Sequence, residues 1–546
     1  MNFWSDHLIV APIVLPLMAA AFLLFFDDRR RVLKSTVSLL AATGLLAITV
    51  LLLFHLHMDA SAGEATTHPY LVGNWPPPFA IVLVLDPLSG FMLALTASLA
   101  VPALIFSLAR WHRAGPHFHS LFLLLLMGLN GAFLTGDLFN LFVFFEVMLA
   151  ASYGLVLYGS GQLRVRAGLH YIVVNLAASL LFLIGVSLIY GVTGTLNMAH
   201  LAQRIATTQP EDRLMLEAGA AILGIAFLVK AGMWPLSFWL PPAYSAAAAP
   251  VAAIFAVMSK VGIYVLLRLS LLFFGDDAGS SADFGRDVLL YGGMATLTFG
   301  MIGVLASQAL GRLASFSVLV SSGTLLIAIG IGNAGVTTGA LFYLASSTLA
   351  ISAFFLLIEL IERGQDATAN VLAVTMEAYG EGEEEEEEEE AGGVIMPGTL
   401  AVLGFGFAAC GMLLAGMPPL PGFLAKFAML SGALNPGGIG EGGEMTPVLW
   451  AFAALLILSG LAALIAMTRT GIRTFWTPVE QTVPRVLLIE VVPVALLLGL
   501  TLALTVQAGP VMRFLNTTAQ GLHSPAGYIE GVMQAPRTEP WGTSKP

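Results

Sequence analysis

The stretch AGMWPLSFWL at residues 231–240 returns at residues 415–424 as AGMPPLPGFL, with six of the ten positions identical. Lys230 immediately precedes the first copy, and Lys426 lies two residues after the second. Glycine and proline inside an apolar helix leave backbone carbonyls and amides without their helical hydrogen bonds. Inside a membrane, such groups occur only where protein surrounds them or where they line a water-filled cavity. The residues expected to break the two helices are Gly232, Pro235, Gly416, Pro418, Pro419 and Pro421. Matching breaks in two halves of a chain indicate an ion pathway.

The composition places the chain in a membrane. Of its 546 residues, 57% are hydrophobic and only 10% are charged, as is typical of polytopic membrane proteins. Continuous rather than alternating apolar runs argue against a β-barrel. The single cysteine, Cys410, excludes an internal disulfide, and no cysteine–histidine cluster indicates a zinc or iron–sulfur site. We therefore expect an all-α bundle without a metal or another cofactor.

Fourteen apolar runs have the length that a bilayer core demands. They fall near residues 8–26, 35–56, 87–109, 119–135, 138–159, 168–190, 214–246, 249–274, 287–307, 313–332, 337–361, 395–432, 448–468 and 485–507. Thirteen of the 23 basic residues then lie in loops on one side, and three lie in loops on the other. Because lysine and arginine mark the cytoplasmic side, the N-terminus is predicted outside. The first run is read as a spanning helix and not as a removed signal peptide, because no basic stretch precedes it.

The repeated decapeptide relates the seventh predicted helix to the twelfth. A unit of five helices has an odd number of crossings, so two such units have opposite orientations, as in many secondary transporters. The predicted parts are three N-terminal helices (1–118), a first five-helix repeat (119–274), a second, inverted repeat (275–470), and the fourteenth helix with a C-terminal tail (471–546).

Three stretches between the helices have a distinct composition. Residues 57–78 are rich in proline and are predicted to form an external loop. Residues 364–394 contain Glu381 and the unbroken run Glu383–Glu390, which predicts a disordered loop; the alternative is an acidic segment that attracts cations or docks a partner. The segment around 195–207 is a candidate for a short interfacial helix.

Four ionisable side chains lie deep in the apolar runs: Glu146, Lys230, Lys260 and Lys426. A charge at the bilayer midplane costs about 2.5–3.5 kcal/mol, so the set costs on the order of 10 kcal/mol unless it is paired. Structural pairing between helices is one explanation, but three lysines need more partners than one glutamate provides. Desolvation favours neutral lysine and a nearby carboxylate favours the charged form, so a Glu146–Lys230 pair can hold or release a proton. We predict a lateral proton relay through these four residues.

Hydroxyl groups and water are expected to complete the relay between Lys260 and Lys426. The candidate side chains are Ser315, Ser317, Ser321, Ser322 and Ser346. Asp137 begins the helix at 138–159 and is either a helix cap, a ligand at the outer mouth or a relay member. Glu359, with Glu362, is a candidate for an inner vestibule.

Other polar residues are given structural roles. Asp86 is expected to cap the helix at 87–109, and Arg268 is expected to snorkel to the outer interface. Glu490 is expected to pair with Arg485. His117 and His119 form an HxH motif without carboxylate or cysteine neighbours and are predicted to be surface residues.

Three stretches carry a family resemblance: GDLFNLFVFFEVMLAASYGLVLYG (136–159), KAGMWPLSFWLPPAYSAAAAPVAAIFAVMSKVGIYVLLR (230–268) and MPPLPGFLAKF (417–427). They resemble the antiporter-like subunits of respiratory complex I, and most closely the D-type subunit of the Mrp-type multisubunit Na⁺/H⁺ antiporters. The resemblance implies fourteen helices and a place in a hetero-oligomer with A-type, C-type and small subunits.

The resemblance also implies residue roles. Glu146 and Lys230 match the family's carboxylate–lysine pair, Lys260 matches its central lysine, and Lys426 matches its second-repeat lysine. One branch of the complex I subunits has glutamate at the last position, so lysine there agrees with the Mrp type. Family members often carry a histidine near the central relay, where this chain has serines such as Ser346.

The sequence therefore predicts a proton-translocating subunit of a multisubunit monovalent cation (Na⁺)/H⁺ antiporter in a bacterial inner membrane. It would contact lipid, H⁺ and Na⁺, and no nucleic acid, and it shows no catalytic or redox motif of an enzyme. One alternative is a proton-pumping subunit of complex I or of a membrane-bound hydrogenase. Another is a structural subunit that transports nothing. No compact cluster of carboxylates and carbonyls marks a sodium site.

Overall fold

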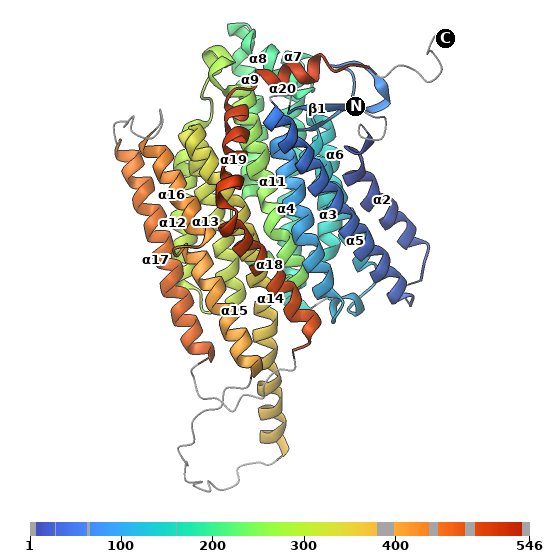
Figure 1. The fold of residues 1–546 in the computed structure, drawn as a ribbon, viewed down its shortest axis with the longest axis vertical. Helices are drawn as coiled ribbons and strands as arrows, with labels where there is room; N and C mark the ends of the chain where they lie inside the picture. The colour runs from blue at the N-terminus through green and yellow to red at the C-terminus, as the bar shows by residue number, and fades with distance from the viewer. Residues whose placement is uncertain are drawn as a thin grey trace.

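Long helices that run side by side form almost the whole molecule (Figure 1). The computed structural model describes residues 7–27, 29–62, 66–159, 161–378, 398–435, 446–475 and 486–537. Among these residues, twelve helices are long and apolar enough to cross a membrane, and Ala11–Leu24, Phe118–Leu134 and Pro421–Leu434 are shorter apolar helices. The prediction of an all-α polytopic membrane protein is confirmed.

Each of the fourteen predicted runs falls on helical structure. The first six are α2 (Ala11–Leu24), α3 (Arg31–Ala62), α4 (Pro87–Ser107), α5 (Phe118–Leu134), α6 (Leu138–Val156) and α7 (Gln162–Thr193). The next five are the broken pair α9 (Pro210–Ala231) and α10 (Leu240–Ala246), then α11 (Ala249–Phe274), α12 (Arg286–Ala306), α13 (Leu310–Ile331) and α14 (Ala334–Ala378). The last three are the second broken pair α15 (Gly398–Ala415) and α16 (Pro421–Leu434), then α17 (Pro447–Phe475) and α18 (Leu488–Val506).

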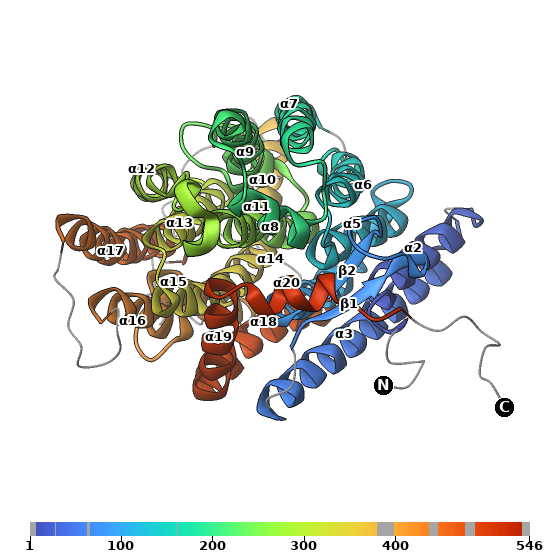
Figure 2. The ribbon, with the colours of Figure 1, turned by 90° about the horizontal axis from the view of Figure 1, so that it is seen from above.

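Helices α11 and α14 occupy the centre of the bundle, as the view from above shows (Figure 2). The most apolar stretches of both are completely buried inside the protein. Apolar burial stabilises them there, and it also means that a charge on either helix is shielded from lipid and from water. Lys260 lies on α11 and is therefore central.

Helix α14 is longer than predicted. The predicted loop at 364–394 begins too early, because the helix continues to Ala378, and its end projects beyond the neighbouring helices (Figure 1). Residues 365–378 are rich in alanine and contain neither glycine nor proline, so helix propensity outweighs their polarity. The glutamate run Glu383–Glu390, with Glu381, lies outside the described residues.

Additional elements cover one end of the bundle. Helix α8 (Met198–Ala206) confirms the helix expected around 195–207. Strand β1 (His68–Leu71) lies in the predicted loop 57–78 and pairs antiparallel with β2 (Val82–Leu85), which follows that loop. Helices α19 (Ala508–His523) and α20 (Ala526–Met533) form in the predicted tail. Helix α20 packs against both α8 and β1, so the C-terminal segment closes over this end (Figure 2).

Candidate functional site

The two predicted breaks have the same backbone geometry. Helix α9 ends at Ala231, and Gly232 follows with a φ of +72°. Helix α15 ends at Ala415, and Gly416 follows with a φ of +73°. In each case the next methionine amide donates to a carbonyl five residues back, Met233 to Leu228 at 3.0 Å and Met417 to Met412 at 3.0 Å. Glycine without a Cβ allows this left-handed helix end.

Proline supports both breaks. Pro235 lies in the link between α9 and α10, Pro418 and Pro419 lie between α15 and α16, and Pro421 is the first residue of α16. Proline has no N–H to donate, so these residues leave the carbonyls of the preceding half-helix available to other donors.

Replacing Gly232 by alanine should destabilise the first break. A Cβ there would lie 2.9 Å from Leu240 Cδ1 and 3.0 Å from Leu319 Cδ2, and the left-handed backbone costs an L-residue about 1–2 kcal/mol. Gly224→Ala is the matched control, because it lies in the same helix with no atom within 4 Å of its added Cβ. We expect a lower thermal midpoint for Gly232→Ala and an unchanged or raised one for the control. Equal midpoints would contradict the assigned geometry.

Lys230 lies in the last turn of α9 and is 4% exposed. Its Nζ donates a hydrogen bond to Asn175 Oδ1 of α7 and lies 4.6 Å from the ring centroid of Phe145 in α6. No ion pair within 4.0 Å joins it to Glu146 among the described residues, and Glu146 Oε1 is buried without a hydrogen-bond partner. In this structure a neutral amide, not the predicted carboxylate, holds the ammonium.

Asn175 was not predicted as a member of the site. Its Nδ2 donates to the carbonyl of Tyr171 at 2.6 Å, which leaves Oδ1 to accept from Lys230. Its position in the sequence could have identified it, because a side-chain amide in the middle of a 32-residue apolar helix needs a hydrogen-bond partner inside the bundle.

Lys260 is completely buried on α11, and its Nζ has no hydrogen-bond partner among the described residues. A Cβ on Gly262 would lie 3.1 Å from Lys230 Cβ and 2.8 Å from the nitrogen of Ala231. Helices α9 and α11 therefore touch at the depth of Lys230, and Lys260 lies within one turn of that contact.

Lys426 reaches back across the second break. Its Nζ donates to the carbonyl of Ala415, the last residue of α15, at 3.3 Å. The C-terminus of a helix carries partial negative charge, which stabilises a nearby cation. Although the two lysines lie on opposite flanks of the breaks in the sequence, each lies at the C-terminal end of the first half-helix.

A small cavity of about 20 Å³ adjoins Lys426, and hydroxyl groups line it. This volume accommodates about one water molecule. The serines in its wall are Ser317 and Ser321 of α13, Ser346 and Ser347 of α14, and Ser459 of α17. Ser321 Oγ and Ser347 Oγ lie 2.9 Å apart and share a hydrogen bond.

Only some of the predicted serines line this cavity. It brings Ser317, Ser321 and Ser346 together with Lys426 but includes neither Ser315 nor Ser322. Ser315 Oγ donates to Gly311 O of its own helix at 2.7 Å, and Ser322 Oγ is buried with no partner in the described part of the chain. Two lining serines, Ser347 and Ser459, were not predicted; each is a hydroxyl in an apolar helix, the signal that identified the others.

Asp137 caps α6. Its carboxylate accepts a hydrogen bond from the amide of Asn140 at 2.9 Å, which is the first of the three roles considered for it. Burial raises the pKa of this carboxyl, while the amide hydrogen bond opposes that effect. Gly136 N donates to Val82 O of β2 and Leu138 N to Leu196 O, both at 2.9 Å, so the strand pair and the segment before α8 hold this helix start in place.

Glu359 belongs to a partly buried charge cluster at the other end of the membrane region. Arg363 bridges Glu359 at 2.5 Å and Glu490 of α18 at 2.6 Å, and Trp111 Nε1 donates to Glu359 Oε2 at 2.7 Å. Glu490, whose carboxylate is fully buried, binds Arg363. Its expected partner Arg485 lies outside the described residues, so the Glu490–Arg485 pair stays a prediction.

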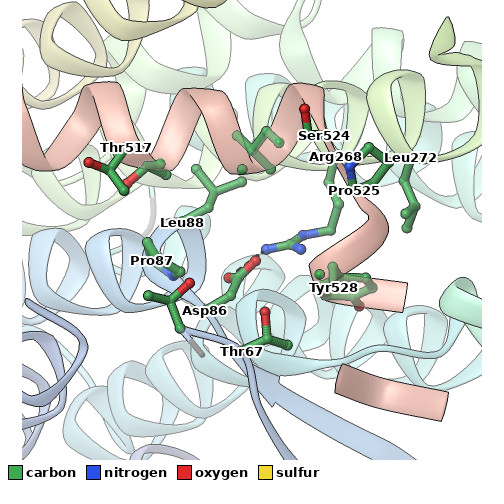
Figure 3. Close-up of a pocket in the computed structure, with 15 residues that line it drawn as sticks. Thr67, Asp86, Pro87, Leu88, Arg268, Leu272, Thr517, Ser524, Pro525 and Tyr528 are labelled. Carbon is green, nitrogen blue, oxygen red and sulfur yellow. Dashed lines mark hydrogen bonds and ion pairs between the residues drawn. The ribbon is translucent and has the colours of Figure 1, made fainter. Parts of the chain in front are cut away.

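Asp86 and Arg268 form an ion pair that the sequence did not predict (Figure 3). Arg268 Nη2 lies 2.8 Å from Asp86 Oδ1, and the two side chains are 6% and 8% exposed. The guanidinium also lies 5.1 Å from the ring centroid of Tyr264 and 5.3 Å from that of Tyr528. The expected snorkelling of Arg268 is therefore wrong, whereas Asp86 does cap α4 by accepting from Ser89 N at 2.8 Å.

The predicted surface position of His119 is also wrong. It is 4% exposed, and neither ring nitrogen has a hydrogen-bond partner among the described residues. His117 is exposed as predicted. The HxH motif straddles the start of α5, so its two members face different surroundings.

Residues 135–439, which carry both breaks and all three lysines, match the family described as "NADH:quinone oxidoreductase/Mrp antiporter, TM". The chain belongs to this family. It is 60% identical to the D-type subunit of a "Probable K(+)/H(+) antiporter" of Rhizobium meliloti over 98% of this chain and 99% of that one. It is 33% identical to the D-type subunit of a "Na(+)/H(+) antiporter" of Alkalihalophilus pseudofirmus over 97% and 100%.

Two solved structures superpose on almost the whole chain. A chain of the Mrp complex from Dietzia sp. DQ12-45-1b superposes with a TM-score of 0.79 at 27% identity, covering 97% of this chain and 100% of that one. A chain of Thermus thermophilus respiratory complex I superposes with a TM-score of 0.72 at 21% identity, covering 95% and 99%, which shows a shared fold. The predicted likeness to the D-type Mrp subunit is confirmed.

Proposed function

We propose that this chain is the proton-translocating, D-type subunit of a multisubunit monovalent cation/proton antiporter in a bacterial inner membrane. Its D-type relatives match it from end to end, and they are transporters rather than enzymes by name. The observation that carries the proton role is the placement of Lys230 and Lys426 at the two breaks, with Lys260 buried on the central helix beside the first.

The two breaks lie in two inverted five-helix repeats under this proposal. Helix α5 packs on α6 and α11, and α12 likewise packs on α13 and α17. Helix α7 contacts both halves of the first broken helix, as α14 contacts both halves of the second. These parallel contacts and the shared glycine geometry support the repeat boundaries near residues 119–274 and 275–470.

The relay starts where Lys230 exchanges partners. Asn175 holds the ammonium in this structure, and a turn of the side chain toward Glu146 would form the ion pair of the closed state. An uncompensated ammonium in the membrane costs about 2.5–3.5 kcal/mol, so a proton on Lys260 is stabilised only while negative charge or water is near. The serine-lined cavity supplies hydroxyls and space for water beside Lys426.

The likeness to a chain of a multisubunit Mrp complex supports the proposed partners. We propose A-type, C-type and small subunits of an Mrp-type complex as neighbours, and an external N-terminus from the distribution of basic residues. The 60% relative is named for potassium and the 33% relative for sodium, so either cation is a candidate substrate. The driving force on each proton is about 2.3 kcal/mol per 100 mV of membrane potential.

Lys426→Ala tests this function in membrane vesicles that contain the assembled complex. A positioned proton-transfer group contributes about 10²–10⁴-fold, so Na⁺- or K⁺-dependent proton flux should fall by about 100-fold. Phe427→Ala is the matched control, because the next side chain is 62% exposed and outside the relay. Unchanged flux with preserved assembly would instead support a structural subunit that transports nothing. Copurification of quinone-reductase or hydrogenase subunits would support a proton-pumping subunit of complex I or of a membrane-bound hydrogenase.

A further inference from the structure

A crevice of about 1240 Å³ opens beside the first break, between α7, α10, α12 and α13. Its walls include Phe238 and Trp239 from the link that follows α9, Phe299 from α12 and Phe316 from α13. Helices α7 and α12 both lie on the outer edge of the molecule in the view from above (Figure 2). In a membrane this edge is available to lipid.

The mouth of the crevice is basic. Arg166, near the start of α7, and Arg312, near the start of α13, are both exposed. Among the described residues no ion pair or hydrogen bond engages either guanidinium. Arg164 and His170 line the same opening, and Glu362 adds one carboxylate, so positive charge exceeds negative charge there.

We propose that this crevice binds an anionic glycerophospholipid of the surrounding membrane. Arg166 and Arg312 bind the headgroup phosphate, since guanidinium groups match phosphate oxygens in charge and geometry. An acyl chain lies along Phe299 and Phe316 toward Phe238. Basic pockets between spanning helices, with apolar walls below them, have the chemistry that recognises such lipids.

A lipid in this position would contact the first break directly. Trp239 lines the crevice, and its Nε1 donates to the carbonyl of Val229 at 3.2 Å, one residue before Lys230. The bound acyl chain therefore packs against Trp239, whose hydrogen bond holds the last turn of α9. The binding itself does not depend on the proposed transport function, and it is measured without transport.

The test measures phospholipid that copurifies with the detergent-solubilised complex. Each arginine near a phosphate contributes about 1 kcal/mol, so Arg166→Gln with Arg312→Gln should lower the retained anionic phospholipid by about 30-fold. Arg29→Gln with Arg30→Gln is the matched control, because these exposed arginines on the α2–α3 connection lie outside the crevice. Equal retention in the two double variants overturns the proposal.

A second measurement needs no variant. Phosphatidylglycerol vesicles should raise the thermal midpoint of the wild-type complex, whereas phosphatidylcholine vesicles and inorganic phosphate should not. Equal shifts with both lipids overturn the proposal, and so does a shift with phosphate alone. A third measurement uses Ser245→Cys in the crevice wall, whose thiol should remain free in the assembled complex. Cross-linking of this thiol to a partner subunit would overturn the proposal, because the crevice would then belong to that subunit.

Discussion

Lys230→Ala is expected to lower cation-coupled proton flux by about 100-fold while the complex still assembles. The ammonium is the only titratable group on the last turn of α9, and its contacts are the neutral Asn175 and the face of Phe145. Removing it leaves no opposite charge stranded within hydrogen-bond distance. The structure therefore separates loss of the proton carrier from loss of stability.

The measurement is proton flux in vesicles, normalised to the amount of complex that copurifies. Lys230→Arg is the informative companion, because arginine keeps the charge but does not release its proton. We expect it to be as inactive as the alanine variant. If Lys230→Arg transports normally, Lys230 supplies a fixed charge and not a moving proton, and the relay as proposed is wrong.

Arg268→Ala is expected to destabilise the protein by about 3–5 kcal/mol, because it leaves Asp86 buried without its partner. The guanidinium also holds Tyr264 through its hydroxyl at 3.0 Å and lies against the ring of Tyr528 in α20. The expected result is a much lower thermal midpoint and a smaller amount of complex in the membrane.

A double variant distinguishes a stranded charge from lost packing. Asp86→Asn keeps an acceptor for the cap of α4 and removes the negative charge. Asp86→Asn with Arg268→Leu should therefore recover much of the stability that Arg268→Ala loses. If the double variant is no more stable than Arg268→Ala, packing around the arginine and not the ion pair accounts for the loss.

The hydropathy pattern predicted the membrane helices, and the positions of glycine and proline predicted the two helix breaks. Both breaks could be placed from the repeated decapeptide, because a glycine at a helix end and prolines after it act through local geometry. Helix ends were less accurate: α14 continues to Ala378, since local propensity there is not visible to a hydropathy argument.

The pairing of buried charges was not predictable in the same way. Asp86 and Arg268 are 182 residues apart, and Lys230 and Asn175 are 55 apart, so only the packing of whole helices determines which groups meet. The same holds for Arg363, which binds Glu490 of a helix 127 residues away. The sequence identified Glu146 and the three lysines as costly to bury, and the structure shows the neighbours of Lys230 and Lys426.

Helix α14 runs without interruption from the buried hydroxyls of Ser346 and Ser347 to Ala378, which is about 22 Å beyond Arg363 at 1.5 Å per residue. A straight, hydrogen-bonded rod transmits axial movement with little loss. A slide of one residue's rise, about 1.5 Å, is larger than the whole range of good hydrogen-bond lengths. A displacement of the projecting end along this axis would therefore move Ser347 relative to Ser321, with which it shares a 2.9 Å contact beside Lys426.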